Sequence, residues 1–191
     1  REGTVPGVGL VTGSGAQTRT EEVMGHKPCL VIADHLTRNG IAVLRDDDRG
    51  FGSSGGTFST STTYDFKDDA LAAVGFLKGR PEIDKSNIGI LGHSEGGTIV
   101  FMAAAESPDV AFIISLAGMA IDGKTLLVQQ NRDMLIEMGM PGEEVDSYCK
   151  MLPGLFNAAL AVSPVYLIEN SETMASRLIA GWDNAPAWAT G

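Results

Sequence analysis

Cysteine is scarce in this sequence of 191 residues. The two cysteines, Cys29 and Cys149, lie 120 positions apart and belong to no Cys-x-x-Cys pair. This spacing argues against a zinc site and against a disulfide framework. We expect both residues to be buried thiols, and a single bridge between them stays an open alternative.

Positive charge is also in short supply. The chain has 14 Lys and Arg residues against 24 Asp and Glu residues, which gives a net charge of -10. A surface of this sign repels phosphate backbones and anionic lipid surfaces, so we expect no nucleic-acid partner.

Long hydrophobic runs are missing. No apolar run approaches the roughly 20 residues that a membrane-spanning helix needs, and the first residues do not resemble a signal peptide. We therefore expect a soluble protein of unassigned compartment. Because residue 1 is Arg rather than Met, we also expect the native N-terminus to lie outside this sequence.

Strand-like and helix-like segments alternate through the first part of the chain. Apolar runs typical of buried strands alternate with helical spacings, and glycines or prolines separate them. This order predicts an α/β domain with a parallel sheet flanked by helices, over residues 1–118. The expected strands cover residues 8–12, 41–44, 87–91 and 110–116, and the expected helices cover residues 28–38, 65–78 and 97–105.

The pattern changes after Gly118. Residues 119–191 contain three helix-like segments and no strand of comparable quality, so we interpret them as a helical insertion. The expected helices cover residues 124–138, 143–151 and 171–179.

Residues 88–97 carry the strongest chemical signal. They read Ile-Gly-Ile-Leu-Gly-His-Ser-Glu-Gly-Gly and place Ser94 in a Gly-x-Ser-x-Gly arrangement between a strand and a helix. This arrangement is typical of a nucleophile elbow, in which Gly92 and Gly96 allow close backbone passage. We predict that Ser94 is a nucleophile and that the backbone N–H of Glu95 stabilises an oxyanion.

A second glycine-rich segment follows the first expected strand. Residues 12–15 read Thr-Gly-Ser-Gly, and the N–H of Ser14 is our candidate for the second oxyanion donor. Further along, residues 47–54 read Asp-Asp-Arg-Gly-Phe-Gly-Ser-Ser, a loop composition without the Lys-Ser or Lys-Thr of a phosphate-binding loop.

These three segments together resemble the α/β-hydrolase superfamily, and within it bacterial serine esterases and acyl hydrolases with a helical cap. The resemblance covers about residues 5–118 and implies that residues 119–191 form the cap. It further implies that Asp47 and Arg49 brace a loop beside the active site. The sequence departs from the pattern at Asp46, where an aromatic residue is common.

The resemblance also implies a base histidine after the nucleophile in chain order. All three histidines precede Ser94. His93 is adjacent to the nucleophile, so we expect it to make a structural hydrogen bond, and we expect His26 and His35 to be surface or packing residues. We therefore expect the C-terminal core strands, with the triad Asp and His, to lie beyond Gly191.

The function implied is a serine hydrolase that cleaves carboxylic esters, or thioesters, through an acyl-enzyme on Ser94. No metal and no organic cofactor is implied, and the expected partner is a small-molecule ester. Two alternatives stay open: a serine peptidase of the dipeptidyl-peptidase-like branch, and a non-catalytic binding module of hydrolase fold. A nucleotide-binding oxidoreductase fits less well, because Gly7 and Gly9 precede or begin the strand instead of following it. The oligomeric state is not predicted.

Overall fold

The computed structural model describes residues 3–160, which form two compact units that divide after Met119. The first unit is built around a parallel sheet of four strands in the order β2-β1-β3-β4. The α/β class expected from the sequence is confirmed. The strands are β1 (Val5–Val11), β2 (Ala42–Arg45), β3 (Ile83–His93) and β4 (Phe112–Leu116).

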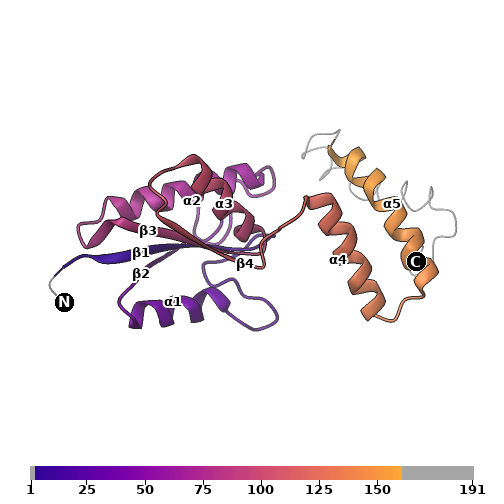
Figure 1. Ribbon diagram of the computed structural model, residues 1–191, viewed down its shortest axis with the longest axis horizontal. Helices are drawn as coiled ribbons and strands as arrows, with labels where there is room; N and C mark the ends of the chain where they lie inside the picture. The colour runs from indigo at the N-terminus through magenta and orange to yellow at the C-terminus, as the bar shows by residue number, and fades with distance from the viewer. Residues whose placement is uncertain (1–2, 161–191) are drawn as a thin grey trace. The chain divides into compact units, whose positions relative to one another are not determined.

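Helices cover both faces of this sheet (Figure 1). The helix α1 (Pro28–Arg38) lies on one face, and α2 (Thr63–Lys78) and α3 (Glu95–Glu106) lie on the other. Because side chains alternate across a strand, β1 and β3 supply a core to each face. One core joins Val8, Leu10 and Leu91 to α1, and the other joins Ile88 and Ile90 to α2 and α3.

The edge strand β4 is covered unequally. Ile113 packs into the core beneath α2 and α3, and the Ser115 hydroxyl donates to the Gly97 carbonyl oxygen at 2.9 Å. On the opposite face Phe112, Ile114 and Leu116 are 36–38% exposed. The sequence has apolar residues on both faces of this strand, but within the described residues only one face is packed.

Several boundaries differ from the sequence expectations, and three of the differences have a local physical cause. The helix α2 begins two residues early because the Thr62 N–H donates to Asp65 Oδ2 at 2.7 Å, which caps its first turn. The helix α3 begins at Glu95, so two glycines lie in its first turns despite their poor helix propensity. The strand β3 begins at Ile83, because Val5 of β1 pairs with it across an irregularity in register.

The described part of the second unit is a pair of helices, α4 (Gly123–Glu137) and α5 (Gly142–Leu160). Arg132 Nη1 and Asp146 Oδ1 are 2.6 Å apart and link the two helices. We expect α5 to end before Pro153, but it continues through this residue, although proline donates no helical N–H and its ring crowds the preceding turn. The helix expected over residues 171–179 lies outside the described residues.

Both cysteines are buried free thiols, and no bridge joins them. Among residues 3–160, no helix is both long and apolar enough to cross a membrane.

Replacing either of two glycines on neighbouring helices with alanine should change the stability of the protein, in opposite directions. A Cβ at Gly97 would lie 2.7 Å from Gly118 Cα, whereas a Cβ at Gly75, exposed within α2, would meet nothing within 4 Å. We expect Gly97→Ala to lower the free energy of unfolding by about 3 kcal/mol through overpacking. Gly75→Ala should raise it by roughly 0.5–1 kcal/mol through helix propensity. Urea denaturation followed by circular dichroism measures both, and a neutral Gly97→Ala would contradict the close packing.

Candidate active site

Ser94 is the single residue between the end of β3 and the start of α3. Its backbone has φ 54° and ψ −115°, a left-handed conformation that is uncommon for a residue with a side chain. The Ser94 N–H donates to the Leu116 carbonyl oxygen at 2.8 Å, which ties this bend to the end of β4. Strained residues of this kind concentrate at functional sites.

The Ser94 hydroxyl is not used to cap the helix. A serine at the N-cap usually accepts a hydrogen bond from an N–H of the first helical turn. Here the side chain makes no such bond, and no other side-chain hydrogen bond of Ser94 is found among residues 3–160. Its Oγ is therefore available to a ligand.

Gly92 and Gly96 lie where the backbone crosses itself. A Cβ at Gly92 would lie 2.0 Å from the Gly96 carbonyl oxygen, and a Cβ at Gly96 would lie 2.4 Å from the Val11 carbonyl oxygen. No side chain fits at either position. The two glycines thus let the start of α3 rest against the ends of β3 and β1.

The loop after β1 reaches the same point. A Cβ at Gly13 would lie 3.2 Å from Ser94 Cβ, so this loop passes directly beside Ser94. Ser14 follows and is exposed, and its N–H has no hydrogen-bond partner within the described part of the chain. Glu95 is the first residue of α3, so its N–H has no partner inside the helix. Two backbone donors near Ser94 therefore have no hydrogen-bond partner among residues 3–160.

Glu21 is a central residue of the site that sequence reasoning missed. It is 1% exposed, and its Oε1 accepts from the Gly13 N–H at 2.7 Å and from His93 Nδ1 at 2.8 Å. Its Oε2 accepts from the Cys29 thiol at 3.1 Å. The segment Thr-Arg-Thr-Glu-Glu reads as a solvated loop, and no pattern in it distinguishes the buried acid from its neighbour Glu22.

His93 makes one polar side-chain contact among the described residues, with Glu21. Since carboxylate oxygens only accept hydrogen bonds, Nδ1 of His93 carries the proton in this contact. His26 and His35 are exposed. Among residues 3–160, no histidine forms a hydrogen bond with Ser94, and no group of His, Cys, Asp and Glu side chains could hold a metal ion.

Burial raises the pKa of the Cys29 thiol to about 12, and its hydrogen bond to Glu21 contributes in the same direction. Cys29 is 2% exposed. The residue is therefore a neutral thiol that donates to Glu21 rather than a nucleophile.

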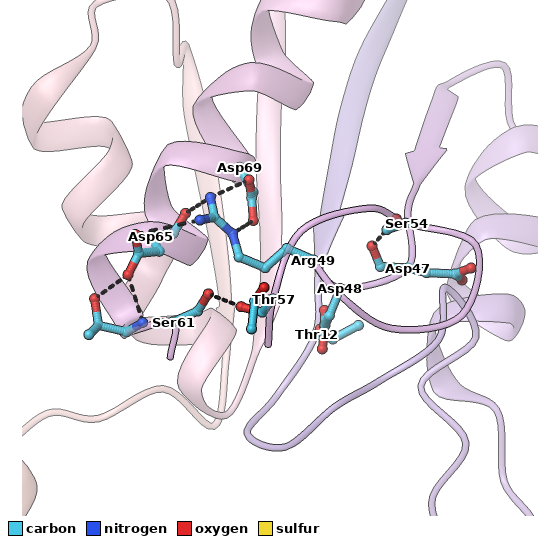
Figure 2. A network of polar contacts seen from close by, with 10 residues as sticks. Thr12, Asp47, Asp48, Arg49, Ser54, Thr57, Ser61, Asp65 and Asp69 are labelled. Carbon is cyan, nitrogen blue, oxygen red and sulfur yellow. Dashed lines mark hydrogen bonds and ion pairs between the residues drawn. The ribbon is translucent and has the colours of Figure 1, made fainter. Parts of the chain in front are cut away.

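Asp47 is a buried carboxylate that accepts hydrogen bonds from within its own loop and from Arg19. Both of its oxygens accept from Arg19 side-chain nitrogens, at 2.9 and 2.8 Å, and the Ser53 N–H donates to Oδ2 at 2.8 Å. These hydrogen bonds, from Arg19 above all, hold the pKa of Asp47 well below its usual range. The Ser54 hydroxyl donates to the Asp47 carbonyl oxygen at 2.6 Å, as Figure 2 shows.

Arg49 joins the same loop to α2. Its Nε and Nη2 donate to the two carboxylate oxygens of Asp69, each at 2.6 Å, and Nη2 also donates to the Asp65 carbonyl oxygen at 2.8 Å (Figure 2). A bidentate pair of this kind fixes orientation as well as distance. These contacts fit the bracing role that we propose for Asp47 and Arg49.

Asp48 fastens the loop after β1. The Thr12 hydroxyl donates to Oδ1 at 2.7 Å, and the Gln17 N–H donates to Oδ2 at 2.8 Å. Burial raises the pKa of Asp48 despite these hydrogen bonds.

A small cavity of about 40 Å³ lies behind this loop, between the end of β1 and the two helices α2 and α3. Four carboxylates contribute to its lining, and the Glu95 carboxylate among them accepts from the Thr63 hydroxyl at 2.6 Å. The Glu95 side chain is therefore tied to α2. The other three are Asp46, Asp48 and Asp69.

The parallel sheet, the bend at Ser94 and the adjoining loop after β1 define the chain as an α/β hydrolase. A family model described as "Serine aminopeptidase, S33" matches residues 29–140, more than half of the chain, and the chain belongs to this family. The superfamily suggested by the sequence is confirmed.

Several solved structures have the same fold, among them two that are 25% identical to this chain. An esterase of Pyrococcus furiosus, Pf2001, is 25% identical, with a TM-score of 0.57 over 73% of this chain and 49% of its own. Est1E from Butyrivibrio proteoclasticus, solved with ferulic acid bound, is 25% identical, with a TM-score of 0.52 over 67% and 48% of the two chains.

A curated relative is an uncharacterised 31.7 kDa protein of Escherichia coli from the traX-finO intergenic region. It is 34% identical over 100 residues, which are 52% of this chain and 34% of that protein. The chain thus matches about a third of the length of this relative and about half of the length of Pf2001 and of Est1E.

The cavity carboxylates predict a pH-dependent stability. Partial burial of its carboxyl group, followed by the neighbouring carboxylates of Asp69 and Asp48, raises the pKa of Asp46 to about 6 from the usual 3.8. The folded state therefore binds the proton more tightly, and ionisation of Asp46 lowers stability as the pH rises from about 4 to 6. Asp46→Asn should raise the free energy of unfolding at pH 7.5 by roughly 1 kcal/mol, since water still reaches this residue.

The stabilisation that Asp46→Asn provides should vanish below pH 4, where Asp46 is neutral in both the folded and the unfolded state. Urea titrations at several pH values between 4 and 8 measure it. Asp84→Asn is the control of opposite sign, because hydrogen bonds from Ser86 and Asn87 lower the pKa of Asp84. A gain for Asp46→Asn that does not change with pH would contradict this assignment.

Proposed function

We propose that the protein is a serine hydrolase that cleaves carboxylic esters through an acyl-enzyme on Ser94. The observation that carries the proposal is the bend at Ser94, whose hydroxyl caps no helix and lies beside a glycine-rich loop with a free N–H. The family match supports hydrolysis, and the Pyrococcus furiosus esterase of similar fold supports an ester substrate.

In the proposed reaction, Ser94 Oγ attacks the acyl carbonyl carbon as its proton passes to a base. The carbonyl oxygen becomes an oxyanion, which we propose is stabilised by the N–H groups of Ser14 and Glu95. Collapse of the tetrahedral intermediate breaks the ester bond and releases the alcohol, which takes the proton. Water then attacks the acyl-serine, releases the acid and restores the Ser94 hydroxyl.

The base is proposed to come from outside the described residues. His93 Nδ1 is occupied by Glu21, and His26 and His35 lie at exposed positions. The role proposed for His93 is structural. Its hydrogen bond to Glu21 keeps the end of β3, next to the nucleophile, in contact with the loop after β1. Residues 119–191 are proposed to act as a cap over the substrate.

Peptide hydrolysis is the second candidate, because the matching family is described as a serine aminopeptidase. The two activities share the acyl-enzyme and differ in the leaving group. Parallel assays with p-nitrophenyl esters and with amino-acid p-nitroanilides separate them. Faster turnover of the anilides, as kcat/KM, would favour the peptidase.

Ser94→Ala in the natural full-length protein tests the nucleophile. We expect esterase activity to fall by a factor of about 10⁴ or more, because no other group forms the acyl-enzyme. A fluorophosphonate probe should label the parent protein at Ser94, as peptide mass spectrometry would show, and should leave the variant unlabelled. Ser54→Ala, which alters a serine used only for loop structure, is the labelling control. Unlabelled parent protein that is folded would favour the non-catalytic binding module.

The oxyanion assignment makes a separate prediction at Ser14. Because only the backbone N–H is used, Ser14→Ala should change kcat by less than about threefold. A loss approaching the 10²-fold or more that typically follows removal of an oxyanion donor would show instead that the Ser14 hydroxyl takes part. Steady-state kinetics with a p-nitrophenyl ester gives the comparison.

A further inference from the structure

Glu21 is a buried acid that the proposed reaction does not use. It lies in the loop between β1 and α1, is 1% exposed, and has φ 51°, a left-handed conformation that is uncommon for a residue other than glycine. Its N–H donates to the Thr18 carbonyl oxygen at 2.8 Å and closes a tight turn. Backbone strain and burial of a carboxyl group both cost free energy, so its position requires compensating contacts.

Those contacts come from three separate parts of the first unit. Oε1 accepts from the Gly13 N–H, in the loop after β1, and from His93 Nδ1, at the end of β3. Oε2 accepts from the Cys29 thiol, in the first turn of α1. Glu21 therefore joins the two segments that flank Ser94 to a helix on one face of the sheet.

The contact with Gly13 decides which backbone donors remain free. Because the Gly13 N–H points to Glu21 Oε1, it is not available to an oxyanion. The next N–H along the chain is that of Ser14, which has no partner among residues 3–160. A Cβ at Gly13 would lie 3.1 Å from Glu21 Oε1 and 3.2 Å from Ser94 Cβ, so the Gly13 backbone is held between the acid and the nucleophile.

We propose that Glu21 is a positioning residue that holds the loop after β1 against Ser94, so that the Ser14 and Glu95 N–H groups share one oxyanion site. This role rests on the proposed function. Glu21 does not touch the substrate and acts through the Gly13 peptide and His93. Its loss should therefore weaken stabilisation of the transition state more than binding of the substrate.

The experiment compares three variants of the natural full-length protein. Glu21→Ala removes every acceptor, and we expect kcat to fall about 10²-fold with KM changed less than threefold. Glu21→Gln keeps an acceptor oxygen for Gly13 and His93 and should recover most of that loss. Cys29→Ala removes the third partner only, and is the control that should leave kcat within threefold.

Activity is counted per active site, titrated with a fluorophosphonate, so that unfolded protein does not enter kcat. A trifluoromethyl ketone, which forms an oxyanion on the serine, provides a second readout. Its affinity should weaken in Glu21→Ala in proportion to kcat and should be recovered in Glu21→Gln. A merely structural role would lower the melting temperature and the number of titrated sites without changing kcat per site.

The outcomes distinguish the two proposals. If Ser94→Ala keeps activity, the proposed function is wrong whatever Glu21 does. If Ser94 is the nucleophile but Glu21→Ala keeps kcat per titrated site and ketone affinity within threefold of the parent, the positioning role is wrong. Equal losses in kcat and in substrate binding would also contradict it.

Discussion

The reversal of the chain at Ser94 is the constraint on which the rest of the first unit depends. One residue separates β3 from α3, so the backbone must turn within a left-handed conformation. The turn is possible only because Gly92 and Gly96 let backbones approach to distances that exclude a Cβ. The same turn leaves the first N–H groups of α3 pointing past the end of the sheet, and it leaves the Ser94 hydroxyl without a capping role.

Around this bend, three consecutive aspartates experience three different environments. Asp47 is paired with Arg19 and has a lowered pKa, whereas burial raises the pKa of Asp48, which holds the loop after β1. Asp46 lines the cavity beside other carboxylates and has a pKa of about 6. The pKa values of these three sequence neighbours thus differ because their side chains have different surroundings just after β2.

Much of the fold could be predicted from the sequence, because alternating apolar runs and glycine stops are local signals. The strand at residues 41–44 and the helix at residues 28–38 were expected within one residue of their observed limits. Errors arose where distant contacts override local preference. The first turns of α3 contain Gly96 and Gly97, poor helix formers that are needed for close packing against β1 and β4.

The sequence by itself determined the α/β class, the order of the elements and the position of Ser94 between a strand and a helix, because each depends on spacing along the chain. Only the tertiary structure decided which polar groups meet. Gly13 and Glu21 lie eight residues apart in the loop between β1 and α1, Cys29 lies in α1 and His93 ends β3. No local pattern marks Glu21 as buried. The physical reason is that hydrogen bonds between segments depend on how the strands and loops converge at one edge of the sheet, and this convergence exists only after folding.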